Sequence, residues 1–151
     1  SLALHLPGNF SYNHIPWTTY TDPEFASVGL NEQRASERGI SYSVHVSEIG
    51  EIDRANAERE TAGRIKVLLD QKERIIGTQI ISAHAGELIT PSLFAVKGKW
   101  KFSRMMGPVY PYPTFGEIHK KSAGSYAAPK LFNEQVRKYL RFLFHYRGVS
   151  G

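Results

Sequence analysis

A short segment rich in proline and aromatic residues, 110–117, carries the side chains of this sequence that are best suited to chemistry. It reads Tyr-Pro-Tyr-Pro-Thr-Phe-Gly-Glu. Pro111 and Pro113 each fix the backbone φ at about −65° and lack an N–H donor, so the segment belongs neither inside a helix nor inside a sheet. We interpret it as a stiff, extended presenter of the Tyr112 phenol and the Glu117 carboxylate.

A purely structural interpretation of the same residues stays open. A polar helical pattern follows at 118–121, and Thr114 has the side chain of a helix N-cap. Glu117 lies three residues later, where the carboxylate of a capping box belongs. Aromatic-proline turns are common, and most of them serve the fold alone. The segment is therefore either a rigid turn that enters a capped helix or an edge that presents functional side chains.

Length and composition bound the class of protein. A chain of 151 residues with 41% hydrophobic and 22% charged residues fits one globular domain with a core of its own. The sequence has no cysteine, which excludes disulfides, thiolate catalysis and cysteine-bound zinc within this chain. We expect no metal site and, because a net charge of +5 is modest, no nucleic-acid partner.

Signals for targeting and for nucleotide binding are missing from the sequence. It contains no run of about 18 apolar residues, and its first residues lack the basic start of a signal peptide, so we expect a cytoplasmic protein. Neither G-x-G-x-x-G nor G-x-x-x-x-G-K occurs. Hydride transfer therefore cannot be complete within this chain, and we expect no cofactor bound to it alone.

The order of short strands and helices is typical of an α+β fold. Strand patterns occur at 15–21, 25–30, 40–46, 63–70 and 74–81, and helical patterns at 32–38, where Asn31 is the predicted cap, and at 85–99. The link 71–73 is short enough for an antiparallel hairpin, so we expect a mostly antiparallel sheet with helices packed on it. The stretch 51–60 fits a surface helix or a loop, His84 fits a polar contact at a helix N-terminus, and the alternation at 40–46 places His45 on the polar face.

The two ends of the chain differ from its middle. We interpret 1–14 as an irregular lead-in, 15–124 as the domain, and 125–151 as a linker followed by a basic, aromatic helical tail. The composition typical of a linker begins at Ser122 and ends at Ala128, and the helical pattern begins at Lys130. Apolar side chains in the tail share one helical face: Leu131, Phe132, Val136, Tyr139, Leu140, Leu143 and Phe144. This C-terminal amphipathic helix either docks on its own subunit or lies on an anionic membrane or partner. A basic-aromatic stretch at 97–102 is interpreted as a solvated rim, with a phosphate contact as the alternative.

Three separated motifs resemble the FAD-dependent pyridine nucleotide-disulfide oxidoreductases, the family of glutathione reductase, dihydrolipoamide dehydrogenase and mercuric reductase. Residues 112–117, Tyr-Pro-Thr-Phe-Gly-Glu, resemble the family's His-Pro-Thr-x-x-Glu signature. Residues 21–29 are similar to its T-x-P-E-x-A-x-V-G segment, and 82–89 to its strand, turn and A-x-E-x-I pattern. The three motifs follow the family's order, so the chain resembles the family's C-terminal dimerisation, or interface, domain.

The resemblance implies a homodimer in which FAD and NAD(P) are bound by upstream domains of the same polypeptide. It implies that Tyr112 and Glu117 reach the partner subunit's active site as catalytic-site residues, and that Tyr112 and Pro113 face the flavin. The parent reaction would pass hydride from NAD(P)H through FAD to a disulfide or a metal ion. The alternative is a non-catalytic dimerisation or membrane-surface module that acts through the basic tail.

The tyrosine at position 112 departs from the histidine that most members of the family carry there. Histidine, with a pKa of about 6.5, exchanges protons near neutrality, whereas tyrosine, with a pKa of about 10, is only a hydrogen-bond donor at pH 7. This departure argues against a glutathione- or lipoamide-type reaction and is similar to the mercuric reductase pattern. Without cysteine, the chain cannot hand on mercury through its own C-terminus.

Overall fold

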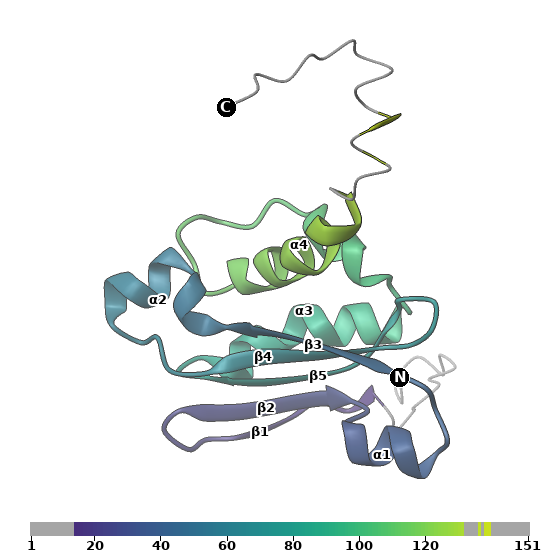
Figure 1. Ribbon diagram of the computed structural model, residues 1–151. Helices are drawn as coiled ribbons and strands as arrows, with labels where there is room; N and C mark the ends of the chain where they lie inside the picture. The colour runs from purple at the N-terminus through teal and green to yellow at the C-terminus, as the bar shows by residue number, and fades with distance from the viewer. Residues whose placement is uncertain (1–13, 132–135, 137, 140–151) are drawn as a thin grey trace, which may run out of the picture.

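The two long helices, 85–97 and 117–131, cover one face of a five-stranded sheet in the computed structural model (Figure 1). The structure describes residues 14–131, 136, 138 and 139. The strands are β1 (Trp17–Thr19), β2 (Glu24–Gly29), β3 (Ser43–Glu48), β4 (Arg64–Leu69) and β5 (Ile75–Ser82). The helices are α1 (Glu32–Glu37), α2 (Asp53–Glu58), α3 (Ala85–Lys97) and α4 (Glu117–Leu131), with short 3-10 helices η2 (Ile49–Glu51) and η3 (Phe102–Met106).

The sheet has the strand order β1-β2-β5-β4-β3, and every neighbouring pair is antiparallel. The predicted α+β class and the predicted β4–β5 hairpin are both confirmed. The hairpin turn is held by Asp70, whose carboxylate accepts the backbone N–H groups of Lys72 and Arg74 at 2.8 and 2.9 Å. The stretch left open between helix and loop forms η2 and α2.

The core lies between the sheet and the layer of α3 and α4. Alternate side chains of the central strands point into it, because successive residues of a strand face opposite sides of the sheet. Its fully buried members include Val28, Ile65, Val67 and Ile80 from the strands, Ala85, Ile89 and Ala95 from α3, and Ile118 and Ala123 from α4. Phe102 and Met105 of η3 fill the space under α4. These contacts fix α3 and α4, and with them the segment that precedes α4.

Strand β3 presents the opposite face to the one predicted. The ring of His45 lies edge-on to Phe102 and Tyr126, with centroids 5.7 and 5.5 Å apart, in the layer under α4. Val44 and Val46 are instead 39% and 42% exposed on the face of the sheet that α3 and α4 leave open. The prediction that His45 lies on the polar, outward face is therefore wrong.

Hydrogen bonds to α4 explain why polar side chains face inward on β3. The Ser47 hydroxyl donates to the Ser122 hydroxyl at 3.0 Å, and His45 Nε2 lies 3.0 Å from the Ser125 hydroxyl. Burial, as the largest influence, lowers the pKa of His45, so its ring is neutral between these hydroxyls and the aromatic rings. Because His45 and Ser47 have hydrogen-bond partners on α4, their side chains can lie between the sheet and that helix.

Residues 122–128 lie inside α4, so the interpretation of this Ala/Gly/Ser stretch as a linker is wrong. Ser122, Ala123 and Ala127 are buried, because their small side chains let the helix approach the sheet closely. The lead-in and most of the predicted amphipathic tail lie outside the described residues. No helix within the described ranges is long and apolar enough to cross a membrane.

The chain crosses the open face of the sheet between β2 and α1. At the crossing, the Leu30 carbonyl oxygen occupies the place where a Cβ on Gly77 would lie, only 1.7 Å away. The Gln79 side chain donates to the same oxygen at 3.1 Å. Asn31 then caps α1 as predicted, accepting the Arg34 N–H at 2.9 Å. Glu32 anchors α1 to the sheet through its ion pair with Lys66 of β4 at 2.5 Å.

Candidate functional site

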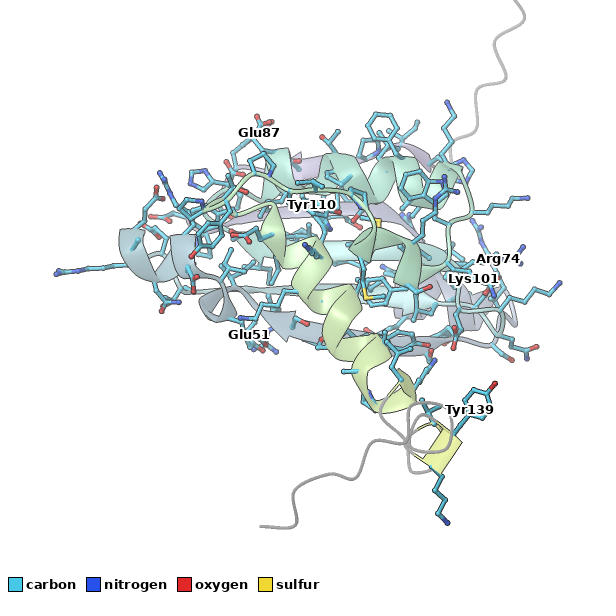
Figure 2. All side chains as sticks on the ribbon, turned by 90° about the horizontal axis from the view of Figure 1, so that it is seen from above. Glu51, Arg74, Glu87, Lys101, Tyr110 and Tyr139 are labelled. Carbon is cyan, nitrogen blue, oxygen red and sulfur yellow. The ribbon has the colours of Figure 1, made fainter. Side chains whose placement is uncertain are left out.

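Residues 110–116 lie between η3 and α4 without regular secondary structure, as predicted from the two prolines, and Glu117 is the first residue of α4. Figure 2 looks onto the helix layer and shows Tyr110 beside the first turns of α4. The peptide bond between Tyr112 and Pro113 is cis. Tyr112 is 69% exposed and Pro113 is exposed, whereas Phe115 is buried. The segment therefore rests on the core through one part and presents Tyr112 and Pro113 to the outside.

The Tyr112 phenol is held by a single carboxylate on α2. Its hydroxyl donates to Asp53 Oδ2 at 2.7 Å. This hydrogen bond is the largest influence that raises the pKa of Tyr112, because it stabilises the protonated phenol, and the charge of Glu117 adds a smaller effect in the same direction. The group presented at this position is accordingly a neutral hydrogen-bond donor rather than a base.

Glu117 begins α4 and fixes the backbone just before the helix. Its carboxylate accepts the Thr114 N–H at 3.4 Å, which is one half of the predicted capping box. The Thr114 hydroxyl donates to the Pro111 carbonyl at 2.7 Å, and among the described residues it accepts no backbone N–H of α4. Thr114 lies three residues before α4, so its prediction as the N-cap is wrong. Glu117 nevertheless orients the end of the segment.

A buried histidine supports the segment from below, and sequence reasoning did not single it out. His119 Nε2 donates to the Leu88 carbonyl at 2.8 Å, and Tyr110 stacks against the ring with centroids 6.4 Å apart. Burial lowers the pKa of His119 to about 4 and raises that of Tyr110. His119 is therefore a neutral structural link between α4 and α3. Its place two residues after Glu117 in a helical pattern was the one available signal.

His84 precedes α3 at its N-cap, as predicted for a residue in a polar contact at a helix N-terminus. Its ring lies edge-on to Phe115 with centroids 4.7 Å apart, and its Nε2 is 3.9 Å from a Glu58 oxygen. This contact attaches the segment to α3 as well. Three helices, α2, α3 and α4, thus hold the backbone that carries Tyr112.

A hollow of about 510 Å³ adjoins the segment between η2, α2 and α4. Asp53, the partner of Tyr112, and Glu117 both line it, together with Glu51, Lys120 and Lys121. The structure therefore brings together the two predicted catalytic-site residues through Asp53, which sequence reasoning missed. In the described part of the chain, no three histidine, aspartate or glutamate side chains gather as metal ligands.

The described fold is an antiparallel sheet with α3 and α4 on one face and an exposed tyrosine-proline edge. The model of the pyridine nucleotide-disulphide oxidoreductase dimerisation domain matches residues 15–123. The chain belongs to this family.

Two curated relatives and one solved structure illustrate the similarity. The chain is 33% identical over 116 residues to mitochondrial dihydrolipoyl dehydrogenase of Schizosaccharomyces pombe, covering 76% of this chain and 23% of that protein. It is 32% identical over 125 residues to mercuric reductase of Shewanella putrefaciens, covering 82% and 21%. An HOCl-induced flavoprotein disulfide reductase from Escherichia coli has a similar fold, with a TM-score of 0.70 at 22% identity over 80% of this chain and 29% of that one. The chain thus spans about a quarter of the length of the proteins it matches.

Proposed function

We propose that this chain is the dimerisation domain of an FAD- and NAD(P)-dependent oxidoreductase that reduces a disulfide or a metal ion, and that it contributes Tyr112 and Glu117 to the active site of a partner subunit. The observation that carries the proposal is the 69% exposure of Tyr112 on a backbone held by three helices. A large aromatic side chain at the outer end of a braced segment is preorganised to meet a second surface.

The chemistry proposed for Tyr112 is hydrogen-bond donation. The pKa of its phenol is raised by Asp53, so the proton is present at neutral pH. The Tyr112 O–H group can exchange its hydrogen bond to Asp53 for one to a thiolate or a flavin carbonyl in the partner subunit. Glu117 has a positioning role, because its carboxylate fixes the Thr114 N–H and hence the direction in which the segment leaves α4.

FAD and NAD(P) are proposed to bind upstream in the same polypeptide, since the sequence carries no dinucleotide-binding loop. Tyr112 and Pro113 are exposed, so they are available to contact a flavin ring that is bound by another subunit. Self-association as a homodimer follows from the same arrangement. The cytoplasmic location expected from the sequence stays a prediction.

The experiment uses the full-length parent enzyme. Tyr112→Phe should lower the steady-state rate with the oxidising substrate by about 100- to 1000-fold, the cost of losing one hydrogen-bond donor to a developing negative charge. Flavin reduction by NAD(P)H, followed by stopped-flow absorbance, should not change. Tyr20→Phe, which removes the hydroxyl of a phenol 82% exposed in this domain, is the matched control. Unchanged steady-state rates in Tyr112→Phe would refute the role of the phenol.

Hybrid dimers test whether the tyrosine acts across the interface. Tyr112→Phe subunits are mixed with subunits that keep Tyr112 but have an inactivated flavin site. If Tyr112 serves its partner, one site in each hybrid is complete and activity returns. If activity does not return, Tyr112 acts within its own subunit or not at all. The alternative function, a module that acts through the basic tail, rests mainly on residues outside the described ones and stays a prediction.

A further inference from the structure

The face of the sheet opposite α3 and α4 (Figure 1) carries apolar side chains from four strands. Trp17 of β1 packs against Phe25 of β2, with ring centroids 5.1 Å apart, and Phe25 lies opposite Ile81 of β5. Val44 and Val46 of β3 lie on the same face beyond β4. We call these five residues the open-face patch. All of them except the half-buried Phe25 are exposed, and exposed apolar side chains gathered on one face indicate a binding surface.

A hollow of about 390 Å³ lies within this face. Phe25, Val46 and Ile81 supply its apolar walls, and Gln79 of β5 lines it between them. The volume equals that of about 13 water molecules at ~30 Å³ each, so the hollow admits a large side chain from a neighbouring body. It shares no lining residue with the hollow beside Tyr112.

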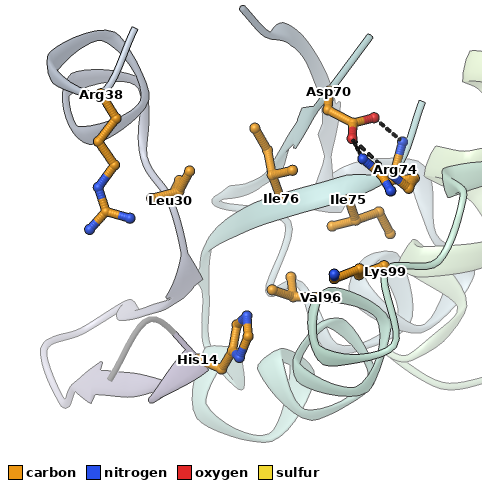
Figure 3. Close-up of a pocket in the computed structure, with 9 residues that line it drawn as sticks. All are labelled: His14, Leu30, Arg38, Asp70, Arg74, Ile75, Ile76, Val96 and Lys99. Carbon is orange, nitrogen blue, oxygen red and sulfur yellow. Dashed lines mark hydrogen bonds and ion pairs between the residues drawn. The ribbon is translucent and has the colours of Figure 1, made fainter. Parts of the chain in front are cut away.

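The side-chain amide of Gln79 is held in one orientation. Its Nε2 donates to the Leu30 carbonyl at 3.1 Å. Leu30 is fixed in turn, because its N–H donates to the Ile76 carbonyl at 2.9 Å, and Figure 3 shows both residues where the chain leaves β2. A rotated amide would bring Gln79 Oε1 against the Leu30 oxygen, and two acceptors cannot bond. The Gln79 Oε1 atom is therefore the end of the amide that faces away from Leu30.

Gln79 Oε1 is a buried acceptor without a donor. Gln79 is only 7% exposed, and none of the described residues donates a hydrogen bond to this oxygen. Folded proteins pair nearly all of their buried polar groups, because an unpaired one has lost its hydrogen bonds to water. The Thr78 hydroxyl is a second such atom, but it lies on the core side of β5, out of reach of a partner. Gln79 borders the hollow, so a donor from outside this chain can complete its bonding.

A second copy of this chain is not the occupant if the two copies meet through Tyr112. The segment that carries Tyr112 leads into α4 on the helix side of the sheet, and the open-face patch lies on the opposite side (Figure 1). A two-fold dimer uses the same surface of both subunits. A dimer formed through the Tyr112 edge therefore leaves the open face of each subunit uncovered.

We propose that an upstream domain of the same polypeptide packs on the open-face patch and donates a hydrogen bond to Gln79 Oε1. The inference rests on the proposed function, which places further domains upstream. The chain matches only 23% and 21% of the two curated relatives above, so a protein of their length has most of its residues outside this domain. At the rim of the hollow, Lys66 is paired with Glu32 at 2.5 Å and Arg64 with Glu48 at 3.6 Å. The charges of the rim are thus used within this chain, and the surface suits an apolar partner with a donor at its centre.

Hydroxyl-radical footprinting with mass spectrometry measures the exposure of Trp17 in the full-length parent and in this chain alone. Trp17 should oxidise at least about tenfold more slowly in the parent, because a covering domain excludes solvent from it. In this chain alone, its rate should not depend on protein concentration. Equal rates in the parent and in this chain would overturn the proposal. Protection that grows with the concentration of the isolated chain would show a second copy on this face and would overturn it too.

The flavin absorbance of the same samples separates this inference from the proposed function. A yellow parent in which Trp17 is unprotected refutes the inference alone. A parent that binds no flavin refutes the proposed function, and the Trp17 rate then still decides whether an upstream domain covers the sheet.

Variants of the parent test the hydrogen bond to Gln79. Gln79→Leu should raise the Trp17 oxidation rate at least about fivefold, because the donor of the upstream domain loses its acceptor. Gln71→Leu, which alters an exposed amide in the β4–β5 turn outside the hollow, should change the rate less than about twofold. Because Gln79→Leu also removes the bond to Leu30, Val46→Asp is a second variant that places a charge in the wall of the hollow and should raise the rate as much. Equal rates in the two glutamine variants would overturn the assigned hydrogen bond, and an unchanged rate in Val46→Asp would overturn the covered face.

Discussion

Protonation of His119 should destabilise the folded domain, because the ring is buried in the helix layer. The ring is 2% exposed, and its pKa falls from 6.5 to about 4 because of burial. In the unfolded chain the imidazole takes up a proton near pH 6.5, whereas in the folded chain it does so only near pH 4. The stability that His119 contributes is thus fully present above pH 6.5 and is lost as the pH falls from 6.5 to 4.

The size of the effect follows from the difference in pKa. One pKa unit corresponds to about 1.4 kcal/mol, so the whole shift is worth about 3 kcal/mol, of which about 2 kcal/mol is lost between pH 7 and pH 5. The pKa of His45 is also lowered by burial and adds a loss of the same sign. The effect of His119 must therefore be measured as a difference between two proteins.

The comparison is between the native chain and His119→Gln. Glutamine keeps an N–H donor for the Leu88 carbonyl but does not titrate. Urea unfolding of both chains at pH 7 and pH 5 gives the free energies. The native chain should lose about 2 kcal/mol more than the variant between these two pH values. The reasoning fails if the native chain and His119→Gln lose the same free energy.

Two further predictions test the sheet crossing and the Tyr112 contact. Gly77→Ala should lower the free energy of unfolding by about 3 kcal/mol in urea titrations, because its Cβ would lie 1.7 Å from the Leu30 oxygen. Gly124→Ala in α4, where a Cβ meets nothing within 4 Å, should instead raise it by about 1 kcal/mol, and equal effects would contradict both assignments. Asp53→Asn should lower the pKa of Tyr112 toward its ordinary value, measured as the ultraviolet difference from a Tyr112→Phe chain. An unchanged titration would show that the contact at 2.7 Å does not persist in solution.

Local sequence was enough to predict the sheet type. Alternating apolar residues with the short link 71–73 can form little else than a hairpin, and β4 and β5 pair as expected. The irregular backbone at 110–116 follows from Pro111 and Pro113, which keep the segment out of regular structure. Features governed by backbone chemistry over a few residues were thus accessible.

Long-range polar contacts were not accessible from the sequence. The face of β3 is decided by Ser122 and Ser125, which bond to Ser47 and His45 across 75 and 80 residues. Asp53 meets Tyr112 across 59 residues. From sequence alone, a serine or an aspartate is predicted to lie on the surface. Its burial costs little only when it finds a hydrogen-bond partner, and a distant partner cannot be predicted from the local sequence.

The crossing of Leu30 over Gly77 has a consequence for whatever packs on the open side of the sheet. Beside α1, that surface carries apolar side chains from several strands: Trp17, Val44, Val46 and Ile81. A protein that packs on these side chains would be limited on one side by α1, which the Glu32–Lys66 ion pair holds against the sheet. The extent of this surface is therefore set by the crossing of Leu30, which only the missing side chain of Gly77 allows.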